Sequence, residues 1–209
     1  MIFSYWENKT WLSNIDFVVV GSGIVGLNCA LELRTKHPKS KIVILEKGLI
    51  PHGASSRNAG FACFGSLTEI ISDLDSHSPL EVSELILKRV SGLNRLRTLL
   101  GDNQIKYKQF GGNEIFLKDD IDKLQSSLEK IDDINKLLEP LFNEKVFELK
   151  KNKFNFRNTL KEVIFNKFEG QIDTGEMMDA LLNKVYKSNI KIINNVSVES
   201  YEDIGSSVN

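Results

Sequence analysis

The order of hydrophobic and polar positions in the first fifty residues predicts a strand, a helix and a second strand. Phe17–Val20 is a β-branched and aromatic run typical of a buried parallel strand. Apolar residues then recur at helical spacing over Ile24–Lys36, before Pro38, and the apolar run at 41–46 predicts the next strand. A unit of about thirty residues in this order is the usual start of a parallel βαβ fold.

Beyond residue 46 this regular alternation stops. Residues 47–65 form a stretch rich in glycine, serine and asparagine, and such long loops inside compact domains tend to be functional. Amphipathic patterns then predict helices at 66–74, 80–100, 119–138 (ending near Pro140) and 175–187. Strands are predicted within 107–118 and 142–168, and at 190–193 and 196–201.

The turn after the first predicted strand has the spacing of a dinucleotide-binding fingerprint. Its residues are Gly21, Ser22, Gly23, Ile24, Val25 and Gly26. The first glycine permits the tight turn, the second lets a pyrophosphate approach the backbone, and the third lets the helix pack closely on the sheet. The start of the helix would present free N–H groups and the positive end of its dipole to the phosphates.

An acidic residue, Glu46, ends the second predicted strand about twenty residues further on, where this fingerprint requires one. Its carboxylate is placed to accept hydrogen bonds from the 2′- and 3′-hydroxyls of a ribose. Because a carboxylate would repel a 2′-phosphate, the pattern favours FAD or NAD over a phosphorylated dinucleotide.

Composition and charge exclude several classes of protein. The chain has 209 residues, 41% of them hydrophobic and 26% charged, with a net charge of −1, as in an ordinary globular protein. Basic residues are balanced by acids and scattered, so no nucleic-acid partner is expected. We expect no membrane span, no signal peptide and a cytoplasmic location. The two cysteines make no disulfide framework, and Cys29 is expected to be a small core residue of the first helix. Without spaced ligand clusters, no metal site is expected.

Together with the fingerprint and Glu46, one loop makes the sequence resemble the D-amino-acid oxidase / glycine oxidase superfamily of FAD-dependent oxidoreductases. The loop runs Gly53, Ala54, Ser55, Ser56, Arg57, Asn58, Ala59 and Gly60, and it follows Lys47 in the same long connection. The resemblance implies that FAD is contacted by backbone amides and short hydroxyls of this region. The residues so implied are Lys47, Ala54, Ser55, Ser56, Asn58, Ala59, Gly60 and, at the adenine, Val196.

The resemblance also implies the architecture. We expect an α/β, Rossmann-like FAD-binding domain, incomplete in this chain, with an inserted α+β portion of a substrate domain. The expected boundaries are 1–75 for the first part of the FAD-binding domain, 76–169 for the substrate-domain portion and 170–209 for the return. A doubly wound sheet needs about five or six parallel strands, and three are predicted. The chain is therefore expected to be the N-terminal half of such an enzyme.

The reaction implied for the complete protein is oxidation of an amine or amino acid by hydride transfer to the flavin, for which the cofactor supplies the difficult chemistry. No catalytic residue is assigned, although His52 lies in the flavin-side loop and is the histidine to follow. An NAD-dependent dehydrogenase stays an alternative, although its third strand should follow Glu46 sooner. A truncated, inactive dinucleotide-binding chain is the other alternative. Its exposed sheet would favour self-association or a partner chain that supplies the missing half.

Overall fold

The structure, a computed structural model, describes residues 3–205 and 207 and divides the chain into two compact units. Unit 1 combines residues 1–59 with 174–209, and unit 2 is Gly60–Asp173. The boundaries expected from the sequence pattern were 75/76 and 169/170. The first differs because helix α3 (Leu67–Leu74) packs against the other helices of unit 2. The functional roles of the two units stay a proposal.

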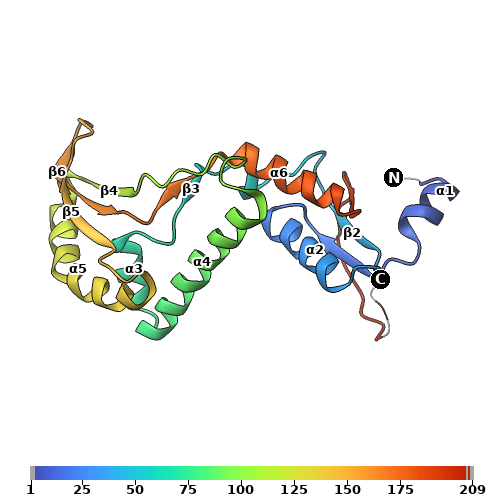
Figure 1. Cartoon of the computed structure of the whole chain (residues 1–209), viewed down its shortest axis with the longest axis horizontal. Helices are drawn as coiled ribbons and strands as arrows, with labels where there is room; N and C mark the ends of the chain where they lie inside the picture. Colours follow the sequence, from blue (N-terminus) through green and yellow to red (C-terminus); the bar gives the residue numbers. More distant parts are fainter. Residues whose placement is uncertain (1–2, 206, 208–209) are drawn as a thin grey trace. The chain divides into compact units, whose positions relative to one another are not determined.

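Unit 1 is built on a parallel three-stranded sheet in the order β1-β2-β8. Its strands are β1 (Phe17–Val20), β2 (Ile42–Leu45) and β8 (Lys191–Ile193). Helix α2 (Ile24–Lys36) packs on β1 and β2, and helix α6 (Thr174–Lys187) packs on α2 and β8 (Figure 1). The predicted βαβ start and the third parallel strand are therefore confirmed.

The two faces of β1 are covered unequally. Val19 is buried on the side where α2 packs, whereas Val18 and Val20 keep 52% and 65% of their surface exposed. Among the described residues β1 pairs only with β2, so its second edge carries no strand. The sheet thus has an unpaired edge next to an exposed apolar surface.

Arg34, near the end of α2, ties the two segments of unit 1 together. Its guanidinium donates to the carbonyl oxygens of Ser188 (3.1 Å) and Asn189 (3.2 Å) after α6, and to that of Ser40 (2.7 Å) before β2. The planar guanidinium can serve several carbonyls in fixed directions, which a lysine cannot do. One side chain thereby joins the turn before β2 to the turn before β8.

Unit 2 contains an antiparallel sheet in the order β4-β6-β5, a short β3-β7 pair and the helices α3, α4 and α5 (Figure 1). The strands are β3 (Phe61–Ala62), β4 (Gly112–Leu117), β5 (Phe147–Lys151), β6 (Thr159–Asn166) and β7 (Gly170–Gln171). The two long helices are α4 (Pro79–Leu100) and α5 (Ile121–Phe142).

Local sequence explains where these helices begin. Ser66 with Glu69, and Ser78 with Glu81, form capping boxes at the starts of α3 and α4. In each box the hydroxyl accepts from the backbone three residues on, and the glutamate accepts from the backbone of the serine. The expected end of α5 near Pro140 is wrong by about one half-turn. The helix passes through Pro140 and ends two residues later at Phe142, where Asn143 takes the left-handed conformation of a C-cap residue.

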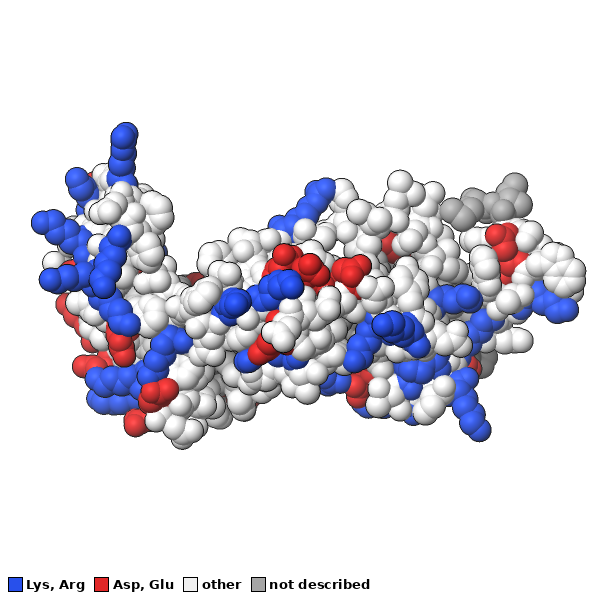
Figure 2. Space-filling model, turned by 45° about the horizontal axis from the view of Figure 1, so that its top comes forward, with Lys and Arg blue, Asp and Glu red and all other residues white. Residues whose placement is uncertain are grey.

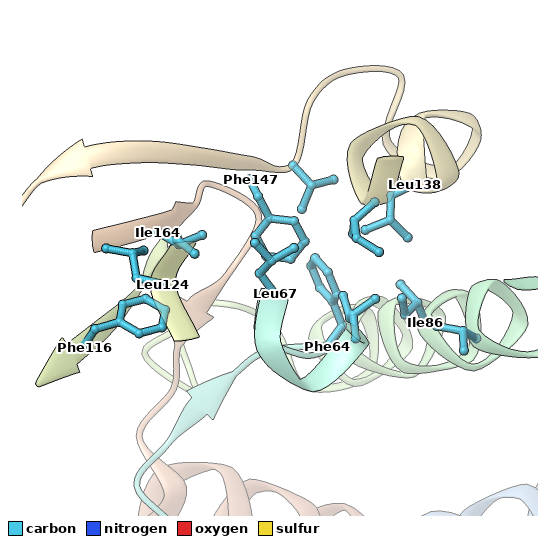
Figure 3. Close-up of a cluster of buried hydrophobic side chains, with 12 residues drawn as sticks. Phe64, Leu67, Ile86, Phe116, Leu124, Leu138, Phe147 and Ile164 are labelled. Atoms are coloured by element: carbon cyan, nitrogen blue, oxygen red, sulfur yellow. The ribbon is translucent and has the colours of Figure 1, made fainter. Parts of the chain in front are cut away.

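The core of unit 2 lies between the sheet and the helices (Figure 3). Phe64, Leu67, Ile86, Leu138 and Phe147 converge there from the segment before α3 and from α3, α4, α5 and β5. A buried amide fastens β5 to this core: the Oδ1 atom of Asn135 accepts from the backbone N–H groups of Val146 and Phe147, both at 2.9 Å. Its Nδ2 atom donates to the carbonyl oxygen of Phe147 (3.0 Å), so all its polar groups are satisfied.

Two expectations for unit 1 are wrong. Residues 196–201 form no strand, although the N–H of Val196 donates to the carbonyl oxygen of Glu46 (2.9 Å). Cys29 is exposed, because it shares the solvent face of α2 with Val25 four residues before it, while Leu27 and Ala30 are buried.

Within the described residues, we find no helix of the length and apolarity needed to cross a membrane.

Candidate functional site

A hollow of about 390 Å³ lies where the parallel strands β1 and β2 end, within the size range of small-molecule sites. This is the edge at which open α/β sheets bind their ligands. All of its lining comes from unit 1. The lining residues are Val20, Gly21, Gly23, Leu45, Glu46, Lys47, Pro51, His52, Gly53, Ser55, Val196, Ser197 and Val198.

Gly21 and Gly26 have the backbone roles that the fingerprint spacing predicts, and the pyrophosphate role of Gly23 stays a prediction. Gly21 has φ +91°, in the left-handed region that favours glycine. A Cβ at Gly26 would collide with the carbonyl oxygen of Gly21 and approach Val19 to 3.3 Å, so only glycine allows α2 to pack this closely on the turn. A Cβ at Gly23 would lie 3.0 Å from the Oγ atom of Ser55, on the wall of the hollow.

The start of α2 is capped from outside the fingerprint. Gly23 is its N-cap residue and has no side chain to offer, but the N–H of Ile24 donates to the Oγ atom of Ser55 at 3.0 Å. Ser55 lies in the short 3₁₀ helix Ala54–Ser56. The serine hydroxyl thus occupies one of the N–H groups that an anion at this helix terminus would use.

Glu46 is held in place by the turn itself. Its Oε2 atom accepts from the backbone N–H (2.8 Å) and the hydroxyl (2.7 Å) of Ser22, and its Oε1 atom accepts from the N–H of Gly48 (2.9 Å). Burial raises the pKa of the Glu46 carboxyl, but the hydrogen bonds from Ser22 and Gly48, with the charge of Lys47, outweigh it, so the pKa lies below its ordinary value. A fixed, ionised acceptor therefore stands at the end of β2.

The loop that follows is organised by its own short side chains. The hydroxyl of Ser56 donates to the carbonyl oxygen of Pro51 (3.0 Å), and the Nδ2 atom of Asn58 donates to that of Ala54 (3.0 Å). The hydroxyl of Thr174, at the start of α6, donates to the Oδ1 atom of Asn58 (2.9 Å). These contacts tie the loop to the second segment of unit 1.

The predicted site residues fall into two groups. Gly21, Gly23, Glu46, Lys47, Ser55 and Val196 line the hollow together. Ser22 lies fully buried behind Glu46, Val25 points outward with 83% of its surface exposed, and Ile24 and Gly26 belong to the start of α2. Ala54, Ser56, Asn58, Ala59 and Gly60 do not line it. Gly60 belongs to unit 2.

Several lining residues were not anticipated from the sequence. Leu45, Pro51, Ser197 and Val198 carry no motif of their own, and Gly53 begins the loop 53–60 but was not assigned a contact. Ser197 and Val198 were predicted as part of a strand rather than as a wall, and only their proximity to Val196 in the sequence could have indicated them.

His52 does reach the hollow, as its place in the loop indicated. Its Nδ1 atom contacts the Nη2 atom of Arg57 at 3.2 Å, which places a guanidinium beside the imidazole. Across the described part of the chain, no group of three or more histidine, cysteine or acidic side chains could hold a metal ion.

Comparison with solved structures shows the same fold at low identity. L-amino acid deaminase from Proteus vulgaris matches with a TM-score of 0.65 and 19% identity, over 93% of this chain and 43% of that one. Glycine oxidase from Bacillus cereus matches with a TM-score of 0.64 and 19% identity, over 93% of this chain and 51% of that one. The chain thus spans about half the length of these proteins.

Two sequence comparisons give matches, one to a short segment and one to nearly the whole chain. Thiamine thiazole synthase from Coprinopsis cinerea is 48% identical over 55 residues, which are 26% of this chain and 18% of that protein. The family described as FAD dependent oxidoreductase (DAO) matches residues 16–209, which include every residue that lines the hollow. The chain belongs to the DAO family of FAD-dependent oxidoreductases.

Proposed function

We propose that unit 1 binds the ADP half of FAD and that the whole protein uses the flavin to oxidise an amine or amino acid. The observation that carries the proposal is the ionised Glu46 carboxylate in the same hollow as the glycine turn. A dinucleotide needs a diol acceptor and a close approach to backbone N–H groups, and these residues offer both.

The donor set fits such a group. The pyrophosphate would lie against Gly21 and Gly23 at the start of α2, where a side chain at position 23 would meet Ser55. Glu46 would accept from the ribose hydroxyls, and Val196 would border the adenine. When bound, the flavin supplies the hydride acceptor for the oxidation. The chain's own residues hold and orient it.

The loop residues that do not line the hollow keep a role in the proposal. Asn58 and Ser56 shape the loop that carries Ser55, Gly53 and His52. Ala59 and Gly60 follow directly and would contact the flavin side of the cofactor, as the resemblance implies. We assign no catalytic residue, and the expected cytoplasmic location stays a prediction.

Family membership supports FAD over NAD as the cofactor. The substrate class rests on the names of the structural neighbours, which are an L-amino acid deaminase and a glycine oxidase. The chain spans about half of those proteins, so activity, substrate and any partner chain belong to the proposal for the whole protein.

The test is a visible absorption spectrum of the chain after incubation with FAD and removal of free ligand on a desalting column. We expect retained flavin bands and at least about a tenfold weaker affinity for FAD in Glu46→Gln, from the loss of charge-assisted hydrogen bonds. A parallel incubation with NAD, read by ultraviolet absorbance after desalting, should show little retained ligand.

Two variants make the test specific. Gly23→Val should lose the flavin, because the side chain fills the pyrophosphate approach. Gly92→Val is the matched control, since a Cβ at this exposed glycine of α4 has nothing within 4 Å. Retention of NAD instead of FAD, or equal flavin retention by a folded Gly23→Val variant, would refute the proposal.

A further inference from the structure

The connection between β5 and β6 concentrates positive charge in a chain whose net charge is −1. Residues 149–161 contain five basic side chains and no acidic one. The five are Lys150, Lys151, Lys153, Arg157 and Lys161, and all are exposed. We call this segment the basic hairpin. The acids Glu148 and Glu162 flank it on β5 and β6, and the Nζ atom of Lys150 pairs with a carboxylate oxygen of Glu148 at 3.4 Å.

The backbone of the basic hairpin is fixed by hydrogen bonds centred on Asn152. Its Oδ1 atom accepts from the N–H of Phe154 (3.0 Å), and its Nδ2 atom donates to the carbonyl oxygen of Leu160 (2.8 Å). The hydroxyl of Thr159 donates to the carbonyl oxygen of Phe156 (3.0 Å). The loop therefore has a defined shape, and its exposed side chains are presented by structure.

Two aromatic rings stand at the tip. Phe154 and Phe156 keep 46% and 58% of their surface exposed, and their rings stack on each other with centroids 5.8 Å apart. Neither side chain belongs to the core of unit 2. Large apolar side chains held in the open by a fixed loop indicate a surface that contacts something else.

Some of the cations lie beside one of these rings, Phe154. Lys150 and Lys153 line a shallow hollow together with Phe154 and Phe165, and the Nζ atom of Lys150 lies 3.5 Å from the centroid of the Phe165 ring. Figure 2 shows Lys and Arg side chains gathered over the β5–β6 hairpin, with acidic side chains only nearer its base. The surface thus has an apolar tip with a positive rim.

We propose that the basic hairpin docks the protein on an anionic lipid surface. Lipid phosphates and carboxylates bind the five cations, and the interfacial region of the bilayer takes up the Phe154 and Phe156 rings. The contact is peripheral, and none of the residues proposed to bind FAD takes part in it.

A lipid surface accounts for both the cations and the exposed aromatic rings of the basic hairpin. A nucleic acid would satisfy the cations, but its bases could stack only on the outer faces of the Phe154–Phe156 pair, whereas the interfacial region of a bilayer takes up both rings together. An acidic protein would likewise pair with the cations and leave no specific place for two exposed rings at a tip.

The test is co-sedimentation of the protein with vesicles at about 0.15 M salt. One set contains about one third phosphatidylserine in phosphatidylcholine, and the other contains phosphatidylcholine alone. We expect binding to the anionic vesicles only, weakened by added salt. The triple variant Lys150→Gln, Lys153→Gln, Arg157→Gln should bind at least about tenfold more weakly.

A second triple variant controls for net charge. Lys123→Gln, Lys130→Gln and Lys136→Gln remove the same charge from exposed positions of α5 in the same unit and should bind like the wild type. The double variant Phe154→Ser, Phe156→Ser should lose most of the fraction bound to anionic vesicles. The binding that remains should still weaken with added salt. Both positions are exposed, and thermal unfolding confirms that each variant is folded.

Three results would overturn the proposal. The first is no binding of the wild type to anionic vesicles. The second is an equal loss in the two triple variants, which would mean that charge acts without regard to place. The third is tighter binding to a single-stranded oligonucleotide or to polyglutamate, either of which would assign the hairpin to that class of partner instead.

Discussion

The carboxylate of Glu46 accepts two hydrogen bonds from one residue, Ser22, at 2.8 and 2.7 Å. Ser22 is fully buried and Glu46 is 6% exposed. This pair joins the end of β2 to the turn that leaves β1, so the proposed acceptor for a ribose and the proposed binding turn for a pyrophosphate are built as one structure. A change on either side should therefore affect both stability and FAD binding.

Ser22→Ala tests this coupling. Loss of one hydrogen bond to a charged group should lower the free energy of unfolding by about 1.5–3 kcal/mol near neutral pH. Because the pKa of Glu46 is lowered in the folded chain, its stabilisation is present above its unfolded pKa and is lost as pH falls through the folded value. Urea unfolding at about pH 7 and about pH 3 should thus show a smaller difference at the lower pH.

The control for this variant is Ser126→Ala, an exposed serine on α5 whose hydroxyl donates to the carbonyl oxygen of Lys123 in its own helix. It should change stability by less than about 0.5 kcal/mol. An equal effect of Ser22→Ala at both pH values would mean that the hydroxyl acts by packing and not through the carboxylate.

Gly26→Ala should destabilise unit 1 severely. The added Cβ meets the carbonyl oxygen of Gly21, a backbone atom that cannot move without shifting the turn or α2. We expect a loss of about 1–3 kcal/mol or more, as for other overpacked positions, and a weaker affinity for FAD. Denaturant unfolding and flavin retention measure the two effects.

Gly92→Ala is the matched control, and its expected effect on stability has the opposite sign. It places the same methyl group in open space on α4 and should stabilise the chain by about 0.5–1 kcal/mol, since alanine favours the helix. A destabilisation in both variants would show that the close approach at Gly26 is not the cause.

Glu169→Gln should remove a pH dependence from unit 2. Burial raises the pKa of Glu169 to about 7 from its ordinary 4.5, and the nearby carboxylates of Glu69 and Glu114 add to the rise. The folded chain therefore holds a proton that the unfolded chain loses, so stability is full below about pH 4.5 and falls as pH rises through about 7. The glutamine stays neutral and should flatten this decline.

The measurement is the melting temperature from about pH 5 to about pH 8. Near pH 8 the variant should melt at a higher temperature than the wild type. The difference should correspond to a free energy of unfolding on the order of 1 kcal/mol, reduced by the partial solvent exposure of Glu169. Glu129→Gln, at an exposed position of α5, should leave the wild-type profile unchanged. If the melting temperature of Glu169→Gln fell with pH in parallel with that of the wild type, another group would be responsible for the pH dependence.

The beginning of unit 1 was predictable because its signals are local. Three glycines, the strand before them and Glu46 after them lie within about thirty residues, and each is required by the backbone or by the ligand. The partner of Glu46 was not predictable. Ser22 is a variable position of the fingerprint, and nothing in its spacing shows that its hydroxyl turns back to the carboxylate.

Features that depend on residues distant in the sequence could not be predicted either, because no local pattern encodes them. Ser55 caps α2 from a loop 31 positions away in sequence, which no pattern within the helix reveals. Residues 196–201 alternate like a strand but form none: the N–H of Val196 donates to the carbonyl oxygen of Glu46, and the segment lines the hollow instead of adding a strand to the sheet. The exposed face of α2 was misjudged because Val25 and Cys29 are apolar yet sit four residues apart on the solvent side.

The interruption of unit 1 by unit 2 has a consequence for synthesis on the ribosome. Strands β1 and β2 are translated early, but β8 and α6 follow only after the whole of unit 2. Until then the nascent polypeptide holds only the β1 and β2 strands of this sheet, and isolated two-stranded sheets are marginal in water. The hollow at the end of β1 and β2 needs Val196, Ser197 and Val198, so it is completed only after the whole of unit 2 has been synthesised.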